Sequence, residues 1–105
     1  MAEETQPESV RIPLPRKDKD EMFAVVDKLL GGSRMNVVCE DGVSRLARIP
    51  GSKRKRIKKL RSGDLLIIKP WSVQNEKADI VLQYKPYQAR LLSQRNLIPS
   101  EINVF

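Results

Sequence analysis

Short apolar runs separated by turn-forming residues dominate the first half of the chain. Runs at 22–30, 35–39 and 43–49 are rich in β-branched and other apolar side chains, which is typical of strands. Gly31-Gly32 marks a turn between the first two runs. Asp41-Gly42, a strong hairpin signal, separates the second run from the third. The pattern therefore predicts three strands joined by tight turns, which suggests a meander.

The second half of the chain predicts two further strands, at 65–68 and 78–84, of which the first is apolar throughout. Before them, Pro50-Gly51-Ser52 breaks the strand pattern and a longer connector follows. Ile57 and Leu60 lie three residues apart in this connector. We therefore expect a short helical turn that attaches the connector to the core.

A short helix is predicted near the C-terminus. Pro86 suits the first position of a helix, and residues 87–95 are good helix formers. Asn96 provides a stop, and Pro99 forbids continuation of the helix. We expect the tail that ends at Phe105 to be loose.

Five short strands with one longer connector between the third and the fourth match an all-β fold, the five-stranded OB (oligonucleotide/oligosaccharide-binding) barrel. An SH3-like barrel also uses five short strands, and the pattern alone leaves it open. Residues 1–20 carry three prolines and no hydrophobic period, so we expect a flexible N-terminal arm there. The barrel is then expected at 21–85, with the C-terminal helix and tail at 86–105.

Composition excludes several kinds of chemistry. The sequence holds no histidine, the commonest general base and metal ligand. Gly51-Ser52-Lys53 is too short for a phosphate-binding P-loop, and Asp41, Asp64 and Asp79 are isolated carboxylates beside turns or in strands. We therefore expect no catalytic site, no cofactor and no metal site.

The same composition bears on location. Cys39 is the only cysteine, so no internal disulfide forms, which favours a reducing compartment. The acidic N-terminal residues lack the apolar segment of a secretory signal, and no apolar run approaches the length of a membrane span. We expect a cytoplasmic protein with no membrane partner, monomeric in isolation.

The basic residues are concentrated in one segment. The chain carries 20 Lys and Arg against 13 Asp and Glu, a net charge of +7. Nine of the basic residues, and no acidic one, fall within the 17 residues 45–61. Like charges that are packed together repel, so the arrangement costs stability unless an anion relieves it. A merely solvated loop is the alternative, but the segregation favours a phosphate-binding surface.

The position of the aromatic residues indicates the kind of nucleic acid. None of them lies inside the basic window, which favours recognition of structured RNA through its backbone and shape over base stacking. Trp71 and Tyr84 are the best candidates for stacking, although core or rim packing is the more common role for each. Arg45 and Arg48 are three apart on one strand, so a regular strand would point them to opposite faces.

Several fragments of the sequence are similar to one family. They are, in order, Gly31-Gly32-Ser33-Arg34-Met35, Cys39-Glu40-Asp41-Gly42, Arg45-Leu46-Ala47-Arg48-Ile49-Pro50-Gly51, Lys53-Arg54-Lys55-Arg56-Ile57, Ser62-Gly63-Asp64, Lys69-Pro70-Trp71 and Lys77-Ala78-Asp79-Ile80. With these fragments the chain resembles archaeal translation initiation factor 1A, which is related to bacterial initiation factor 1. The resemblance runs from about Phe23 to Leu97.

The resemblance implies an OB barrel with a C-terminal helix that binds the RNA of the small ribosomal subunit in the decoding, A-site region. Such factors help to place initiator tRNA and mRNA and cooperate with other initiation factors. The family's RNA-contacting basic loop falls on Lys53 to Arg56, with Arg34, Arg45 and Arg48 as neighbours. The full set of expected RNA-binding residues is Arg34, Arg45, Arg48, Lys53, Arg54, Lys55, Arg56, Lys58, Lys59, Arg61 and Trp71.

The sequence departs from the family pattern in two respects. Lys58 stands where the family usually has a tryptophan after Arg56-Ile57, so a stacking or packing contact there is lost or replaced by charge. The long acidic C-terminal tail of eukaryotic members is missing, which favours the archaeal branch. A structural ribosomal protein and a general RNA chaperone of the cold-shock type are the alternative functions.

Overall fold

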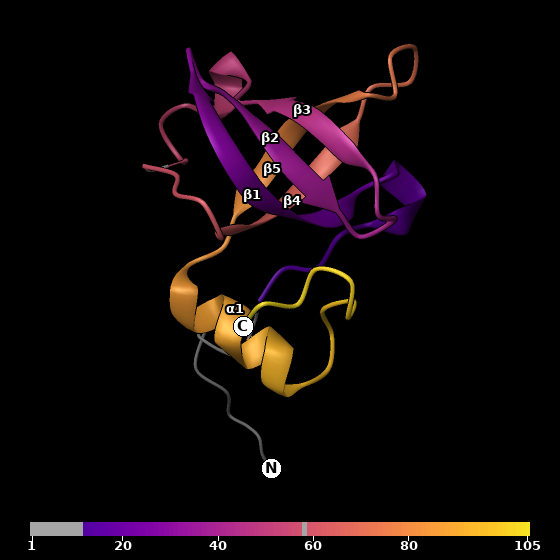
Figure 1. Cartoon of the computed structure of the whole chain (residues 1–105), viewed down its shortest axis with the longest axis vertical. Helices are drawn as coiled ribbons and strands as arrows, with labels where there is room; N and C mark the ends of the chain where they lie inside the picture. Colours follow the sequence, from indigo (N-terminus) through magenta and orange to yellow (C-terminus); the bar gives the residue numbers. More distant parts are fainter. Residues whose placement is uncertain (1–11, 58) are drawn as a thin grey trace.

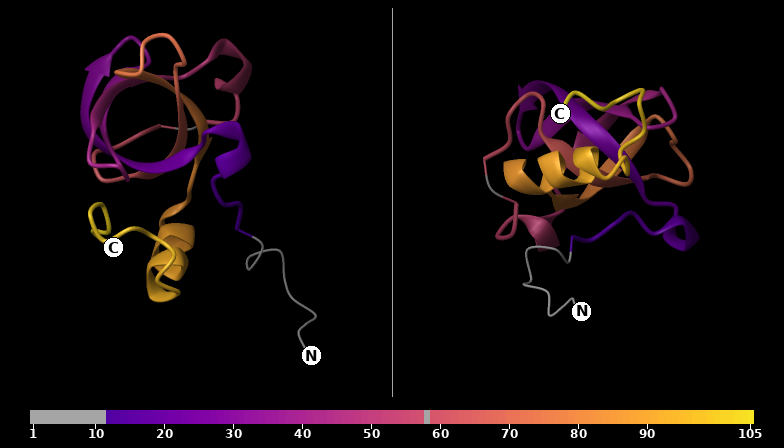
Figure 2. Two further views of the ribbon diagram at one scale, coloured as in Figure 1. Left: turned by 90° about the vertical axis from the view of Figure 1, so that its right-hand side faces the viewer. Right: turned by 90° about the horizontal axis from the view of Figure 1, so that it is seen from below.

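Five strands form a closed barrel in the computed structural model, which describes residues 12–57 and 59–105 (Figure 1). The order around the barrel is β1-β2-β3-β5-β4, and β4 returns to pair with β1. Viewed along the barrel axis, the strands make a complete ring (Figure 2). The strands are β1 (Met22–Gly31), β2 (Arg34–Cys39), β3 (Ser44–Arg48), β4 (Leu65–Pro70) and β5 (Lys77–Gln83).

This topology confirms the OB barrel. The pairs β1–β2 and β2–β3 are antiparallel hairpins, as the turn residues predict, whereas β3 and β5 run parallel. The parallel pair needs a long crossover, which the connector and β4 provide. The two hairpin turns use backbone that favours glycine, with φ of 82° at Gly42 and of 59° at Gly32.

Two apolar clusters explain the hydrophobic pattern. One fills the barrel and includes Val37, Leu66 and Ile80. The other lies between the barrel and α1 (Pro86–Gln94) and includes Leu65 and Leu92. Because β4 contributes side chains to both clusters, the run at 65–68 is buried on its two faces and has no polar alternation.

The C-terminal helix begins and ends where the sequence predicts. Pro86 is its first residue, and the backbone N–H of Lys85 donates to Gln88 Oε1 at 2.9 Å. At the other end Asn96 adopts a left-handed conformation with φ of 58°. The Leu97 N–H then bonds the Leu92 carbonyl at 3.0 Å, and the Asn96 N–H bonds the Ser93 carbonyl. These two bonds form a Schellman motif.

The expectation of a loose tail is wrong. Ile98 and Ile102 are 5% and 3% exposed and belong to the cluster beneath the barrel. The hydroxyl of Ser93 on α1 donates a hydrogen bond to Asn103 Oδ1 at 3.0 Å. The tail therefore folds back over the helix (Figure 1), because two isoleucines four residues apart bury more apolar surface than an extended tail could.

The described part of the expected N-terminal arm contacts the barrel. Residues 1–11 lie outside the described residues. Ile12 packs against the second apolar cluster, and the buried Tyr84 hydroxyl donates a hydrogen bond to the Pro13 carbonyl. The short 3-10 helix η2 (Lys17–Lys19) follows, with Lys17 Nζ 3.7 Å from Glu40 Oε2. Neither η2 nor any other described helix is long and apolar enough to span a bilayer.

Candidate nucleic-acid interface

The basic connector between β3 and β4 is attached to the core by its two apolar residues. It opens with the 3-10 helix η3 (Gly51–Lys53), at the end of the barrel opposite α1 (Figure 1). The N–H of Ile57 bonds the Lys53 carbonyl at 3.0 Å, which closes one helical turn. Ile57 and Leu60 are 8% and 6% exposed and join the barrel core. The predicted attachment to the core is thus confirmed, and the helical turn that the structure describes spans 53–57, before Leu60. The attachment gives the connector a fixed course.

The described charged side chains of the connector are exposed or half-buried and have no acidic partner. No ion pair within residues 12–57 and 59–105 involves any of their side chains. Lys58 lies outside the described residues. The six described cations of the connector are Lys53, which is half-buried, and the exposed Arg54, Lys55, Arg56, Lys59 and Arg61. This cluster has the uncompensated charge that a phosphate-binding surface requires.

A second set of cations lies in one row across the barrel wall. Arg34 on β2 is directly opposite Arg48 on β3, Arg48 is opposite Asp79 on β5, and Asp79 is opposite Lys69 on β4. Arg34, Arg48 and Lys69 are exposed. Two like charges directly opposite each other destabilise a sheet, and one carboxylate only partly offsets three cations.

The row and the connector form one continuous surface. A groove of about 420 Å³ is lined by Arg34 together with Arg54 and Lys59 of the connector, so Arg34 joins the two groups. We call this surface the basic face. It comprises Arg34, Arg48, Lys69 and Lys77 on the strands and Lys53, Arg54, Lys55, Arg56, Lys59 and Arg61 on the connector.

Trp71 lies within the basic face and is held by three neighbours. Its ring centroid is 5.0 Å from the guanidinium carbon of Arg48 and 5.4 Å from Nζ of Lys77. Its Nε1 donates to Asp79 Oδ1 at 3.0 Å, and Arg48 Nε donates to the same oxygen at 2.9 Å. Trp71 therefore supports two cations of the basic face. The structure thus places Trp71, an expected RNA-binding residue, beside Arg48.

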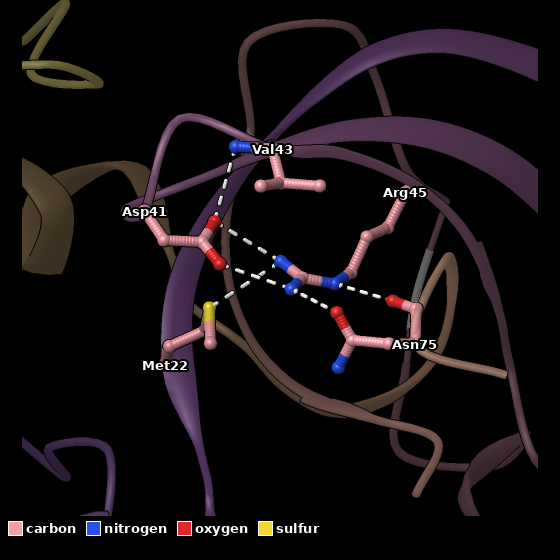
Figure 3. Close-up of polar contacts among 5 residues, drawn as sticks. All are labelled: Met22, Asp41, Val43, Arg45 and Asn75. Carbon is pink, nitrogen blue, oxygen red and sulfur yellow. Dashed lines mark hydrogen bonds and ion pairs between the residues drawn. The ribbon is translucent and has the colours of Figure 1, made fainter. Parts of the chain in front are cut away.

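Arg45 is buried at the edge of the groove that Arg48 and Trp71 also line, contrary to the expectation of a phosphate contact. It is 4% exposed and is the one buried charged residue in the described part of the chain. Figure 3 shows its guanidinium between Asp41 and Asn75. Nη1 and Nη2 bond Asp41 Oδ1 and Oδ2 at 3.1 and 2.9 Å. Nε bonds the Asn75 carbonyl at 2.7 Å, and Nη2 also bonds Asn75 Oδ1 at 2.9 Å. Arg45 and Arg48 do point to opposite faces, as the spacing predicts.

The buried guanidinium influences the pKa of its two titratable neighbours, Asp41 and Cys39. Hydrogen bonds from Arg45 hold the pKa of the Asp41 carboxyl below its usual range. Burial raises the pKa of the Cys39 thiol and so keeps the thiol neutral, although Arg45 opposes the shift. Cys39 is thus a core residue.

A larger groove adjoins the basic face. It has a volume of about 1100 Å³ and is lined by residues that include Arg48, Lys69, Trp71, Val73 and Asn75. Tyr84, the other stacking candidate, does not reach it. Tyr84 is 3% exposed, and its ring centroid lies 6.0 Å from that of Phe23, so its role is packing.

Sequence reasoning missed the carboxylates and two lysines of this region. Asp79 and Asp41 appeared as isolated groups, although each binds an arginine. Lys77 and Asp79 are two residues apart on β5, which places both on one face of that strand, and Trp71 follows directly after β4, two residues beyond Lys69. That spacing was the available signal. In the described residues, no three acidic or cysteine side chains gather into a site for a metal ion.

Comparison with known proteins identifies the family. The family model for translation initiation factor 1A / IF-1 matches residues 9–104. The chain belongs to this family. A translation initiation factor 1A from Thermoplasma acidophilum is 48% identical over 103 residues, covering 98% of this chain and 86% of the relative. The factor from Picrophilus torridus is 43% identical over 105 residues, covering 100% of this chain and 96% of the relative.

Both relatives of this initiation factor come from archaea, so the resemblance to archaeal translation initiation factor 1A is confirmed. The crystal structure of YjeQ from Thermotoga maritima is similar over 62% of this chain and 23% of that chain. Its TM-score is 0.51 and its sequence identity is 18%, so the likeness shows a shared fold alone.

Proposed function

We propose that this translation initiation factor binds the RNA of the small ribosomal subunit with its basic face, near the A site, and acts as a binding protein without catalysis. The proposal rests on one observation above all. The connector carries six described cations that make no ion pair in the described residues, on a backbone that Ile57 and Leu60 attach to the core. A fixed array of unpaired cations suits a phosphate backbone of fixed shape.

Family membership supports the proposed position on the ribosome and the proposed partners. At the A site, the bound factor would help to position initiator tRNA and mRNA and would work beside other initiation factors, in the cytoplasm. The alternatives receive no comparable support. A cold-shock type chaperone needs exposed aromatic platforms on its RNA-binding surface, whereas Phe23 and Tyr84 are buried. Trp71 is held by Arg48 and Asp79. The exposed Tyr87 and Phe105 lie on α1 and the tail, outside the basic face.

Charge reversal tests the proposal. The test variant changes four exposed or half-buried side chains to Glu and leaves the core intact. The four residues are Lys53, Arg54, Lys55 and Arg56. We expect the variant to lose binding to small subunits in a sedimentation assay while its circular dichroism and urea midpoint stay close to those of the wild type. Binding by this variant at wild-type strength would refute the role of the connector.

The matched control carries the same change of charge on another part of the surface. Lys19, Lys85, Arg90 and Arg95 are exposed and lie outside the basic face. Changing these four residues to Glu alters the net charge equally and should reduce binding far less. If both variants lose binding to the same degree, net charge alone is responsible.

Two further measurements test the location and the kind of association. Chemical footprinting of small-subunit RNA should show protection at the A site, and protection confined to another region would contradict that assignment. A factor should leave the subunit in high salt, because phosphate contacts weaken as counterions compete. Retention in high salt would favour a structural ribosomal protein.

A further inference from the structure

We infer that Arg45 is a positioning residue that attaches the β4–β5 loop (71–76) to the barrel. It thereby sets the shape of the 1100 Å³ groove beside the basic face, without contacting phosphate itself. The inference rests on the proposed function for its RNA-binding consequence. Its structural half, the attachment of the loop, rests on the contacts of Arg45 alone.

Every donor of the Arg45 guanidinium has a partner inside the protein. An arginine side chain has five N–H groups. Four of them bond Asp41 and Asn75, and Nη1 also lies 3.7 Å from Met22 Sδ. With the side chain 3% exposed, no donor remains for an RNA phosphate. The role of Arg45 must therefore lie in what it connects.

The partners of Arg45 belong to segments that are distant in the sequence. Asp41 lies in the turn between β2 and β3, where its Oδ1 also accepts the Val43 N–H at 3.1 Å. Asn75 lies in the β4–β5 loop, 30 residues after Arg45. One side chain thus joins the two walls of the 1100 Å³ groove, which both Asp41 and Asn75 line (Figure 3).

The loop needs such an attachment. Residues 72–76 are exposed, Val73 is 92% exposed, and the loop projects beyond the barrel (Figure 1). Backbone bonds hold its base, from Leu46 N–H to the Glu76 carbonyl and from Trp71 N–H to the Lys77 carbonyl, each 2.9 Å. Arg45 adds two bonds at Asn75, within the loop itself. Because Trp71 and Lys77 flank the loop, its course also fixes the adjoining part of the basic face.

A preordered loop favours binding, because RNA then does not have to order it. The variant Arg45→Lys keeps the positive charge but lacks the planar fork that spans Asp41 and Asn75. We expect loop exchange, the hydrogen exchange of the Trp71 and Lys77 amides that bond the Lys77 and Gln74 carbonyls at the base of the loop, to rise about tenfold or more as the loop opens. Affinity for small subunits should fall about tenfold, the cost of ordering a few side chains. The slope of log affinity against log salt should stay unchanged.

Two other variants make the test decisive. Asn75→Ala removes only the side-chain anchor, at an exposed site that does not endanger folding. It should raise loop exchange and lower affinity for small subunits, each by less than Arg45→Lys does. Lys55→Met, in the connector, should reduce the salt slope by about one unit and leave loop exchange as in the wild type.

Two results would overturn the inference. One is that Arg45→Lys and Asn75→Ala both keep the loop exchange rates and the small-subunit affinity of the wild type. The other is a salt slope reduced by about one in Arg45→Met while loop exchange stays normal, which would assign Arg45 to a phosphate. Should the wild type fail to bind small subunits, the proposed function fails, and hydrogen exchange still decides whether Arg45 holds the loop.

Discussion

The guanidinium of Arg48 lies over the ring of Trp71, with 5.0 Å between its central carbon and the ring centroid. Both side chains donate to one oxygen, Oδ1 of Asp79. Arg48 uses only Nε for this bond, and its terminal nitrogens make no hydrogen bond in the described part of the chain. The arrangement therefore holds Arg48 in a fixed position with its terminal nitrogens free to bind an anion.

Replacing Asp79 by Ala should release both of its donors. Since Trp71 is the only tryptophan, its fluorescence reports this site directly. We expect the emission maximum to shift to longer wavelength as the indole N–H turns to water. The free energy of unfolding should fall by about 0.5–1 kcal/mol, because the ion pair is partly exposed. Glu76→Gln removes one charge from the adjacent loop and should change neither quantity. An unshifted emission in Asp79→Ala would contradict this account.

Much of the barrel could be predicted because its signals are local. Asp41-Gly42 and Gly31-Gly32 fix the two hairpins through the backbone that they allow, and Pro86 and Asn96 delimit the helix. The connector could also be predicted, because a run of cations without acidic residues is visible in the sequence. Ile57 and Leu60 were the signal that the run is attached to the core.

The remaining features depend on register, which the sequence does not reveal. Arg48 and Asp79 are 31 residues apart, and Arg45 and Asn75 are 30 apart. Each pair meets only because β3 lies between β2 and β5. Two arginines on one strand thus have opposite roles, one buried and one exposed. The prediction of a loose tail around Ile102 is wrong for a similar reason, since the apolar surface that the tail covers is assembled from distant segments.

Truncating Ile57 should separate the position of the connector from its charge. Ile57→Ala removes buried atoms from the barrel core and should lower the free energy of unfolding by about 2–3 kcal/mol. Affinity for small subunits should also fall, because the cations lose their fixed course, while the salt slope stays unchanged. Ile57→Val keeps the shape and should cost only about 1 kcal/mol in stability. Full affinity in a folded Ile57→Ala variant would show that the course of the connector does not matter.

The tail can be tested with two residues of similar chemistry. Ile102 is 3% exposed, whereas Val104 is 72% exposed. Ile102→Ala should lower the free energy of unfolding by about 2–3 kcal/mol, measured by urea titration, because it leaves a cavity between the tail and α1. Val104→Ala should change it by less than about 0.5 kcal/mol. Equal, small effects of the two substitutions would mean that the tail does not pack in solution.

The buried hydroxyl of Tyr84 makes stability depend on alkaline pH. Burial raises its pKa well above the ordinary value of 10.0, and the charge of Glu21 adds to this. The unfolded chain therefore loses this proton at lower pH than the folded protein does. The contribution of Tyr84 to stability is fully present below about pH 10 and declines above it, by up to about 1.4 kcal/mol per pH unit.

Tyr84→Phe removes this ionisation together with the hydrogen bond to Pro13. At pH 8 the variant should be about 1 kcal/mol less stable than the wild type, the usual value of one hydrogen bond. Above pH 10 the wild type should lose stability faster than the variant, so that the difference between them shrinks and then reverses. Urea titrations at pH 8, 10 and 11 measure this difference. A gap that stays constant from pH 8 to pH 11 would show that the Tyr84 hydroxyl ionises as readily in the folded protein as in the unfolded chain.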